Sequence, residues 1–154
     1  MAARRKASTA GRKKSAALTL SAGSTLDRAA VKAIRQGLVA YNKAKVGPSR
    51  YRALWVVARE PSGAVQGGLR GSTFWNWLCV EWLWVAEASR GRGTGSQLLQ
   101  QAEDIARKRG CVGAYVDTFS FQAPGFYQKQ GYKKFGRLAG LPAGHARIWY
   151  HKPL

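Results

Sequence analysis

Residues 82–109 read WLWVAEASRGRGTGSQLLQQAEDIARKR, and this stretch decides the fold. An apolar run at 82–85 is typical of a strand, and it leads through a short polar link into a basic, glycine-dense turn at 90–95. After the turn, apolar residues recur with the 3.6-residue period of an amphipathic helix, at Leu98, Leu99, Ala102, Ile105 and Ala106. Gly110 follows the basic end of this pattern and predicts the helix C-terminus there. The stretch therefore predicts a strand–turn–helix unit.

The glycine-dense turn is suited to hold an anion. The first N–H groups of a helix have no partner within it, and the helix dipole leaves that end partly positive. Glycine lets the backbone turn tightly and approach a phosphate without a Cβ in the way. Arg90 and Arg92 add two full charges. We therefore expect residues 90–96 to bind a phosphate or diphosphate; the alternative is an ordinary connection in a glycine-rich chain.

Two other phosphate-binding motifs fit these glycines less well. A Walker loop needs a lysine directly after its last glycine, and none follows here. A dinucleotide-binding fingerprint needs Gly-x-Gly-x-x-Gly, whereas Gly91, Gly93 and Gly95 are spaced two apart. Asp117 lies at about the separation expected for an acid that binds a ribose. A nucleotide-binding protein therefore stays open as an alternative.

The same turn resembles the signature of the GNAT superfamily of acyl-CoA-dependent N-acyltransferases. That signature is Arg/Gln-x-x-Gly-x-Gly/Ala between a strand and a helix, and it corresponds here to Arg90, Gly93 and Gly95. A second block, AxxFYxxxGY, is similar to a downstream helix of the family, with Ala123, Phe126, Tyr127, Gly131 and Tyr132. Both motifs occur in the order and at the separation usual in the family. The resemblance covers about residues 16–154.

Length and composition agree with one globular domain. A chain of 154 residues, of which 45% are hydrophobic, is long enough for a single core, and no apolar run approaches the length of a membrane span. Cys79 and Cys111 lie in apolar surroundings without neighbours at metal-ligand spacing. We interpret both as reduced core residues, and we expect a cytoplasmic protein without a metal site. The sequence allows a monomer or a homodimer.

The net charge of +19 indicates a chain that attracts anions. These anions include CoA phosphates and nucleic acid. A non-catalytic nucleic-acid- or ribosome-associated protein is therefore the alternative function, although no known nucleic-acid-binding motif accompanies the charge.

The pattern along the rest of the chain predicts an α/β protein with a mixed sheet. The expected order is β-α-β-β-β-α-β-α-β-β, after a disordered basic N-terminal arm at residues 1–15. Short apolar or alternating runs bounded by turn residues predict strands at 17–21, 51–59, 64–70, 73–85, 112–118, 132–137 and 146–151. Besides the helix after the glycine turn, helices are expected at about 24–42 and 123–130.

Two details of this pattern are more specific. Ser24 and Asp27 resemble a capping box at the start of the first helix. Both faces of residues 73–85 are mostly apolar, which predicts one long central strand covered on both sides. The GNAT resemblance implies the same order of elements in a single domain over residues 16–154. It also implies that two parallel central strands splay apart to admit acyl-CoA.

The resemblance further implies acetyl-CoA as cofactor and direct transfer of its acetyl group to a primary amine. The diphosphate is expected at the turn, with Arg90, Gly91, Arg92, Gly93, Thr94, Gly95 and Ser96. Backbone contacts along the pantetheine are expected from Leu83, Trp84 and Val85, and the N–H of Val85 is expected to polarise the thioester carbonyl. Neither cysteine falls in either motif, which disfavours a covalent enzyme intermediate.

Two residues are candidates for proton transfer. Tyr127 is the candidate acid, because a phenol is protonated at neutral pH and can give its proton to a thiolate; the alternative is a packing role. Glu81 lies within a strand whose face is otherwise apolar, and burial would raise the pKa of its carboxyl toward values useful to a base. The alternative for Glu81 is an ion pair with one of the many arginines.

Two further residues are candidates for binding the acceptor. Asp117 lies at the end of the next strand and can bind the amine, act as base or cap a turn. His145 lies in the loop before the last strand and can reach the acceptor site or remain exposed. The acceptor itself is expected to be a small-molecule amine or a peptide or protein amine. Because the chain has only seven acids, a strongly cationic drug is not the first expectation.

Overall fold

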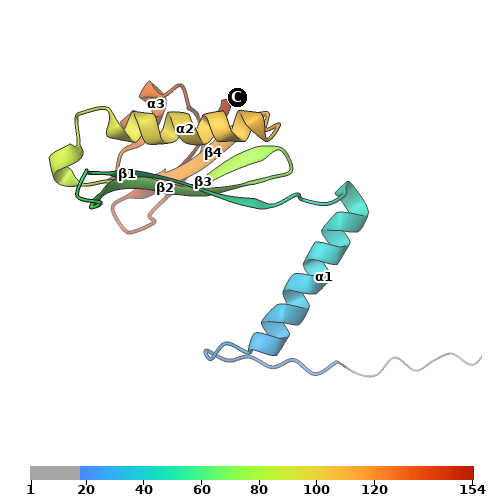
Figure 1. Cartoon of the computed structure of the whole chain (residues 1–154). Coiled ribbons are helices and arrows are strands. Elements are labelled where there is room, and N and C mark those ends of the chain that lie inside the picture. The colour runs from blue at the N-terminus through green and yellow to red at the C-terminus, as the bar shows by residue number, and fades with distance from the viewer. Residues whose placement is uncertain (1–17) are drawn as a thin grey trace, which may run out of the picture. The chain divides into compact units, whose positions relative to one another are not determined.

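The computed structural model describes residues 18–154 of the chain (Figure 1). The basic arm predicted at residues 1–15 and the first residue of the strand predicted at 17–21 lie outside this range. The described chain divides into two compact units, one that ends at residue 41 and one over residues 42–154. We describe each unit by itself.

In the described part of the first unit, residues 18–27 form no regular element and are followed by most of helix α1 (Arg28–Val46). The strand predicted at 17–21 is wrong for its described part, because residues 18–21 form no strand and pair with no described strand. Leu18 and Leu20 are 95% and 96% exposed. A lone run of five residues forms a strand only where another strand offers its backbone hydrogen bonds.

Asp27 is the N-terminal cap of α1. Its Oδ1 accepts the backbone N–H groups of Ala29 at 2.9 Å and Ala30 at 3.0 Å. The predicted cap at Ser24 is therefore wrong, because a carboxylate directly before the first helical residue satisfies these N–H groups. The helix also runs one turn beyond the predicted end near Asn42. It stops only before Gly47, whose φ of +82° places it in the left-handed region.

The second unit is built on a six-stranded sheet with the order β1-β2-β3-β4-β6-β5. The only parallel neighbours in this sheet are β3 and β4; all other pairs are antiparallel. The predicted mixed α/β fold is confirmed, and the described residues form six of the seven expected strands. Its elements are β1 (Arg52–Arg59), β2 (Val65–Phe74), β3 (Trp77–Val85), a 3-10 turn (Glu87–Ser89), α2 (Thr94–Lys108), β4 (Gly113–Phe119), α3 (Pro124–Lys129), β5 (Lys133–Ala139) and β6 (Ala146–Pro153).

The strand predicted at 73–85 is wrong as one strand, because these residues contain the end of β2, a turn and the whole of β3. Trp75 and Asn76 have φ angles of 45° and 60° and form the tight turn between β2 and β3. Ser49 and Val112 hold this turn from both sides through backbone hydrogen bonds of 2.8 Å each. Two successive left-handed residues are typical of a hairpin turn. Asn76 is its only sequence signal, because a tryptophan rarely adopts that conformation.

A β-bulge at Glu81 changes which side chains of β3 face the core. Arg70 pairs with Trp82 and Gly71 with Val80, so Glu81 has no partner on β2. Before the bulge Leu78 and Val80 are buried, whereas after it Trp82 is 66% exposed. The expectation that this strand is covered on both sides is therefore wrong for its second half. The bulge inserts one residue and bends the strand.

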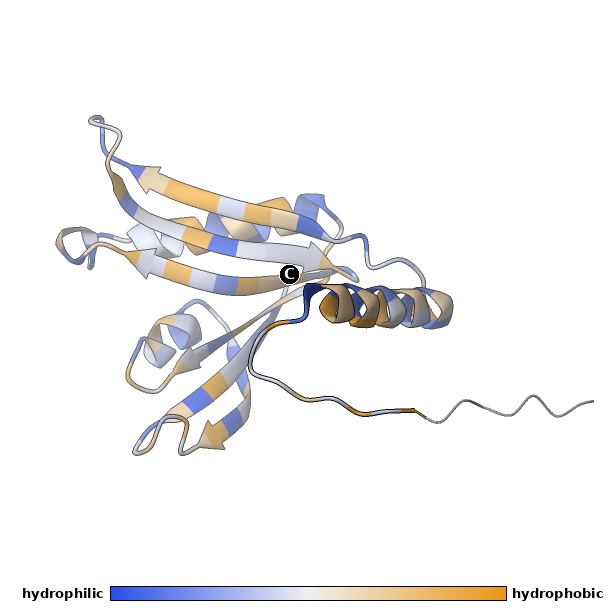
Figure 2. Cartoon of the chain, turned by 90° about the horizontal axis from the view of Figure 1, so that it is seen from below, coloured by the Kyte–Doolittle hydropathy of each residue, from blue (hydrophilic) through white to orange (hydrophobic). Residues whose placement is uncertain are grey.

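The parallel pairing between β3 and β4 is short. It runs from Trp77 opposite Gly113 to Val80 opposite Val116 and then ends. Beyond this point β3 stays paired with β2, and β4 stays paired with β6. The two halves of the sheet diverge in Figure 2, as the family resemblance implied.

Helix α2 packs on β1, β2 and β3, and a buried carboxylate ties it to the other half of the sheet. Glu103 is 2% exposed and accepts the Tyr132 hydroxyl at 3.0 Å and the Lys152 ammonium at 2.7 Å. Tyr132 directly precedes β5, and Lys152 lies in β6. Burial, followed by the neighbouring Glu103, raises the pKa of Tyr132. This network therefore links the helix to both strands of the far edge.

We expect Glu103→Gln to lower the free energy of unfolding by about 3 kcal/mol, because it leaves the Lys152 ammonium without its buried counter-charge. Urea unfolding monitored by circular dichroism measures this change. Asp104→Asn is the matched control, since Asp104 lies on the same helix but pairs with Arg107 in solvent. Its expected change is below about 1 kcal/mol. Equal losses in the two variants would contradict a special role of the buried network.

Candidate functional site

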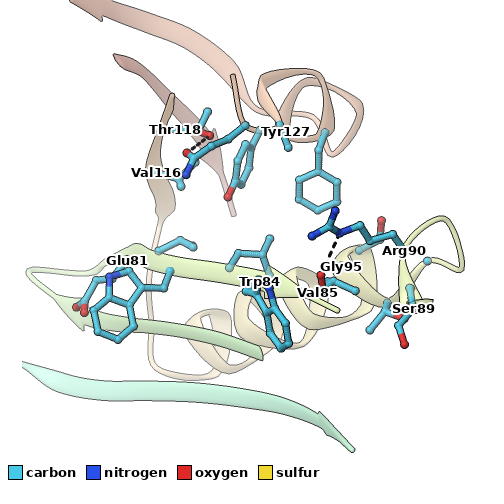
Figure 3. A pocket seen from close by; sticks show the side chains of 18 of the residues that line it. Glu81, Trp84, Val85, Ser89, Arg90, Gly95, Val116, Thr118 and Tyr127 are labelled. Atoms are coloured by element: carbon cyan, nitrogen blue, oxygen red, sulfur yellow. Dashed lines mark hydrogen bonds between the residues drawn. The ribbon is translucent and has the colours of Figure 1, made fainter. Parts of the chain in front are cut away.

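A cavity of about 870 Å³ lies where β3 and β4 diverge. Its walls come from the second half of β3, the turn after it, the start of α2, the end of β4 and α3 (Figure 3). This volume lies in the range of sites that enclose a small ligand or cofactor. The end of strand pairing therefore produces a concave site large enough for a small ligand or cofactor.

The start of α2 presents free backbone N–H groups to this cavity. Gly93 is the N-terminal cap, with φ +81°, and no side chain caps the helix. The first hydrogen bond within the helix runs from the N–H of Gln97 to the carbonyl of Gly93 at 3.0 Å. The N–H groups of the three preceding residues are therefore without helical partners, and these residues line the cavity: Thr94, Gly95 and Ser96.

Side-chain packing does not require the glycine at position 95. A Cβ at this position would lie 3.4 Å from the Phe126 ring and 3.7 Å from the Val85 side chain, which are ordinary van der Waals distances. The close approach of an anion that the sequence motif predicts therefore stays the reason expected for this glycine.

The two arginines of the turn differ in their positions. Arg90 lines the cavity, and its Nε donates to the carbonyl of Val85 at 3.1 Å, as Figure 3 shows. Arg92 is not among the lining residues, whereas Gly91 is. Of the ten residues expected to bind the cofactor, the cavity brings together nine, and Arg92 lies outside it.

The second half of β3 exposes an unpaired backbone edge to the cavity. The N–H of Ala86 donates to the carbonyl of Gln66 in β2 at 2.8 Å. Backbone groups alternate in direction along a strand. The N–H groups of Val85 and Leu83 therefore point away from β2, toward the side on which β4 has diverged. This is the orientation expected of a donor to the thioester carbonyl.

Tyr127 points into the cavity from α3. The residue is 6% exposed, and its ring contacts those of Phe126, Tyr132 and Tyr150. In Figure 3 its hydroxyl is directed toward the space between the two strands. Burial, and to a smaller extent the Asp117 carboxylate, raises the pKa of Tyr127 to about 12. The phenol is therefore protonated at neutral pH.

Glu81 lines the cavity, but it is not the unpaired buried carboxylate that its neighbours in sequence predicted. Its Oε1 accepts the Ser72 hydroxyl at 3.0 Å, and its Oε2 lies 3.4 Å from the Nε of Arg70. The side chain is 28% exposed. The physical reason is the bulge, which takes Glu81 out of the alternation of the strand. The ion pair that was the alternative for this residue is therefore present.

The two residues expected to bind the acceptor lie in different places. Asp117 lines the cavity just beyond the last β3–β4 pair, and its Oδ2 accepts the Nε of Arg147 at 2.6 Å. This hydrogen bond and charge pair raise the pKa of Arg147. His145 is not among the lining residues; its Nδ1 lies 3.5 Å from the Ser120 hydroxyl, and its ring contacts Phe121.

The structure adds lining residues to which sequence reasoning assigned no role. Phe121 and Phe126 supply apolar walls, and Thr118 donates its hydroxyl to Gln122 at 3.0 Å. Phe126 falls within the second motif, so its signal was present. Phe121 and Thr118 had no signal, because their placement depends on where β4 separates from β3.

Two further features concern the described residues as a whole. Within residues 18–154, no group of three or more His, Cys, Asp or Glu side chains is arranged to hold a metal ion. None of the helices in this range is long and apolar enough to cross a membrane.

Comparisons with known proteins agree with this geometry. Residues 28–132 match the model of the Acetyltransferase (GNAT) family. The acetyltransferase Atu2258 of Agrobacterium fabrum is 46% identical over 126 residues, which are 82% of this chain and 92% of that protein. The blasticidin-S acetyltransferase of Streptomyces morookaense is 47% identical over 83 residues, which are 53% of this chain and 61% of that protein.

A crystal structure assigned to an acetyltransferase from Agrobacterium tumefaciens superposes with a TM-score of 0.82 at 42% identity, and covers 89% of this chain and 100% of that chain. The family match and the similar fold agree with the motifs at Arg90–Gly95 and Ala123–Tyr132. The chain therefore belongs to the GNAT acetyltransferase family.

Proposed function

We propose that this protein transfers an acetyl group from acetyl-CoA directly to a primary amine. One observation carries the proposal: a single cavity joins free N–H groups at the start of α2, an unpaired edge of β3 and the protonated Tyr127 hydroxyl. These groups match the three needs of the reaction on the cofactor side, which are binding, carbonyl polarisation and proton donation.

The start of α2 is the expected diphosphate site. Its free N–H groups and helix dipole favour an anion, and Arg90 adds a charge from the side. The hydrogen bond from Arg90 to Val85 fixes the turn to the end of β3. The pantetheine then has the unpaired edge of β3 beside it, from Val85 back to Leu83. When bound there, acetyl-CoA supplies an acyl group activated as a thioester.

The chain's own residues polarise the carbonyl and move the protons. The N–H of Val85 stabilises the negative charge that develops on the thioester oxygen. As the amine nitrogen forms its bond to the acyl carbon and the carbon–sulfur bond breaks, Tyr127 donates a proton to the departing sulfur. The amine loses its proton to a base, and Glu81 and Asp117 are the two carboxylates that line the cavity. Tyr127 regains its proton from solvent.

Acceptor identity is open between a small-molecule amine and a peptide or protein amine. The name of one relative, blasticidin-S acetyltransferase, indicates a small-molecule acceptor for that protein. We therefore propose a small-molecule amine as the first class to test. Release of coenzyme A thiol from acetyl-CoA over a panel of amines that includes blasticidin S, together with calorimetric binding of coenzyme A, tests the function. A folded protein that binds no coenzyme A would rule it out.

Arg90→Gln is expected to raise the KM for acetyl-CoA about tenfold, because a charge-assisted contact to the diphosphate is lost. Steady-state thiol release measures this constant. Arg92→Gln is the matched control: it removes the same charge two residues away, from a side chain outside the cavity. Its KM is expected to stay within about threefold of the parent, since only a screened long-range effect remains. A reversed order would place the anion elsewhere.

Tyr127→Phe is expected to lower kcat about 100-fold with little change in the KM for acetyl-CoA, because the acid is removed while the ring is kept. Tyr150→Phe is the control, since Tyr150 is buried and stacks on Tyr127 without lining the cavity. The parent should show no loss of kcat from Tyr127 ionisation between about pH 7 and pH 10, because its raised pKa keeps the phenol protonated below about 12. Parent-like turnover by Tyr127→Phe would exclude it as the acid.

Glu81→Gln and Asp117→Asn compare the two possible bases. If Glu81 acts as base, its variant loses about 100-fold in kcat/KM at neutral pH and recovers part of this loss at high pH, where the amine is already deprotonated. The Asp117 variant should then show mainly a raised KM for the amine. A greater loss of kcat in Asp117→Asn would transfer the role of base to Asp117.

A further inference from the structure

A second cavity, of about 240 Å³, lies at the opposite end of β3 from the acetyl-CoA site. Its walls come from the segment before β1, the hairpin turn between β2 and β3, and the C-terminal end of α2. Strand β3 has nine residues, so its two ends lie roughly 26 Å apart at 3.3 Å per residue. The first cavity reaches along β3 only as far as Val80, and the two cavities share no lining residue, so they are separate sites.

Three arginines converge on this second cavity, and no carboxylate lines it. They are Arg50, Arg52 and Arg109. None of the ion pairs among residues 18–154 includes any of them. Burial, followed by the nearby charge of Arg52, lowers the pKa of Arg109. Like charges that face one concave surface repel each other, and an anion between them would relieve this repulsion.

Arg109 is held in a fixed position by the backbone of β1. Its Nη1 donates to the carbonyls of Arg52 at 3.3 Å and Ala53 at 3.2 Å, and to the Thr73 hydroxyl at 3.2 Å. A guanidinium has five N–H donors, and Nε and Nη2 have no hydrogen-bond partner within residues 18–154. The side chain is therefore anchored through one nitrogen and keeps donors for a ligand.

An aromatic side chain lies beside the three charges. Trp75 lines the cavity, is 41% exposed and is held in its left-handed conformation by the carbonyl of Ser49 at 2.8 Å. An exposed indole next to arginines is the combination on which a nucleobase stacks while its phosphate is bound. The cavity is smaller than the 300–1,000 Å³ typical of sites for whole ligands. It fits one charged group better than an entire cofactor.

We propose that this arginine cavity binds a nucleotide phosphate, with the adjacent base stacked on Trp75. Guanidinium groups match phosphate oxygens in geometry and charge. The phosphate belongs either to a free nucleotide or to a nucleic-acid backbone, and both sources present the same chemistry. The inference is independent of acetyl transfer, because no residue of the cavity lines the acetyl-CoA site.

The test compares the parent with the double variant Arg50→Gln/Arg52→Gln, which keeps the anchored Arg109 and the backbone carbonyl that Arg109 contacts. The matched control is Arg35→Gln/Arg137→Gln, which removes two exposed arginines outside the cavity. Circular dichroism and the thermal midpoint confirm that both variants fold. Two probes are titrated: ADP by calorimetry in saturating coenzyme A, and a labelled single-stranded oligonucleotide by fluorescence anisotropy over a salt series.

We expect the double variant to bind at least one probe about tenfold more weakly while the control matches the parent. A loss for ADP alone assigns a free nucleotide. A loss for the oligonucleotide, with the slope of log K against log salt reduced by about 1.4 for two arginines, assigns a nucleic-acid backbone. Parent-like binding of both probes by the double variant overturns the proposal, and so does an equal loss in the control.

An Arg90→Gln arm separates this site from the acetyl-CoA site. We expect it to leave ADP and oligonucleotide binding unchanged. If the parent binds ADP only in the absence of coenzyme A, and Arg90→Gln rather than the double variant weakens that binding, ADP binds at the start of α2. That result would overturn the second site and leave the proposed acetyl transfer intact.

Discussion

The end of pairing between β3 and β4 is the constraint on which the rest of the structure depends. Four residues of each strand are in register, up to Val80 opposite Val116, and then both strands continue with their outer neighbours. Backbone groups that lose a strand partner need another one. The unpaired edge of β3 therefore faces a cavity that a ligand can fill, and every other group of the site is placed relative to that edge.

Two local features keep β3 and β4 apart. On β3, the bulge at Glu81 bends the strand, and it requires glycine on β2 because a Cβ at Gly71 would collide with the carbonyl of Cys79. On β4, Asp117 pairs with Arg147 of β6 directly after the last contact with β3. The carboxylates of Glu81 and Asp117, which directly follow the last β3–β4 pair, each find a partner in their own half of the sheet. Glu103 holds the two halves together behind the cavity, through Tyr132 and Lys152.

The parts of the site that the sequence predicted are those with local signals. The turn at 90–95 and the helix after it are consecutive in sequence. The glycines, the arginines and the helical spacing of the apolar residues therefore all indicate the same local unit. The hairpin turn at Trp75 and Asn76 was missed, because its conformation depends on Ser49 and Val112, which are distant in sequence. The ion pair of Glu81 was foreseen only as an alternative, since Arg70 lies on another strand. The strand predicted at 17–21 shows the converse: a local apolar pattern without a described strand to pair with.

The two anion sites that we propose differ in which groups would bind the anion. Backbone N–H groups would bind it at one site, and side chains would bind it at the other. At the start of α2 the free N–H groups belong to the backbone, so they persist whatever the side chains are, and Arg90 only adds to them. At the far end of β3 no helix of the described chain begins, and the site consists of guanidinium groups whose positive charges repel one another. A site of the first kind tolerates loss of a charge with a moderate change in affinity. A site of the second kind depends on its charges entirely, because without them its walls contain little else that attracts an anion.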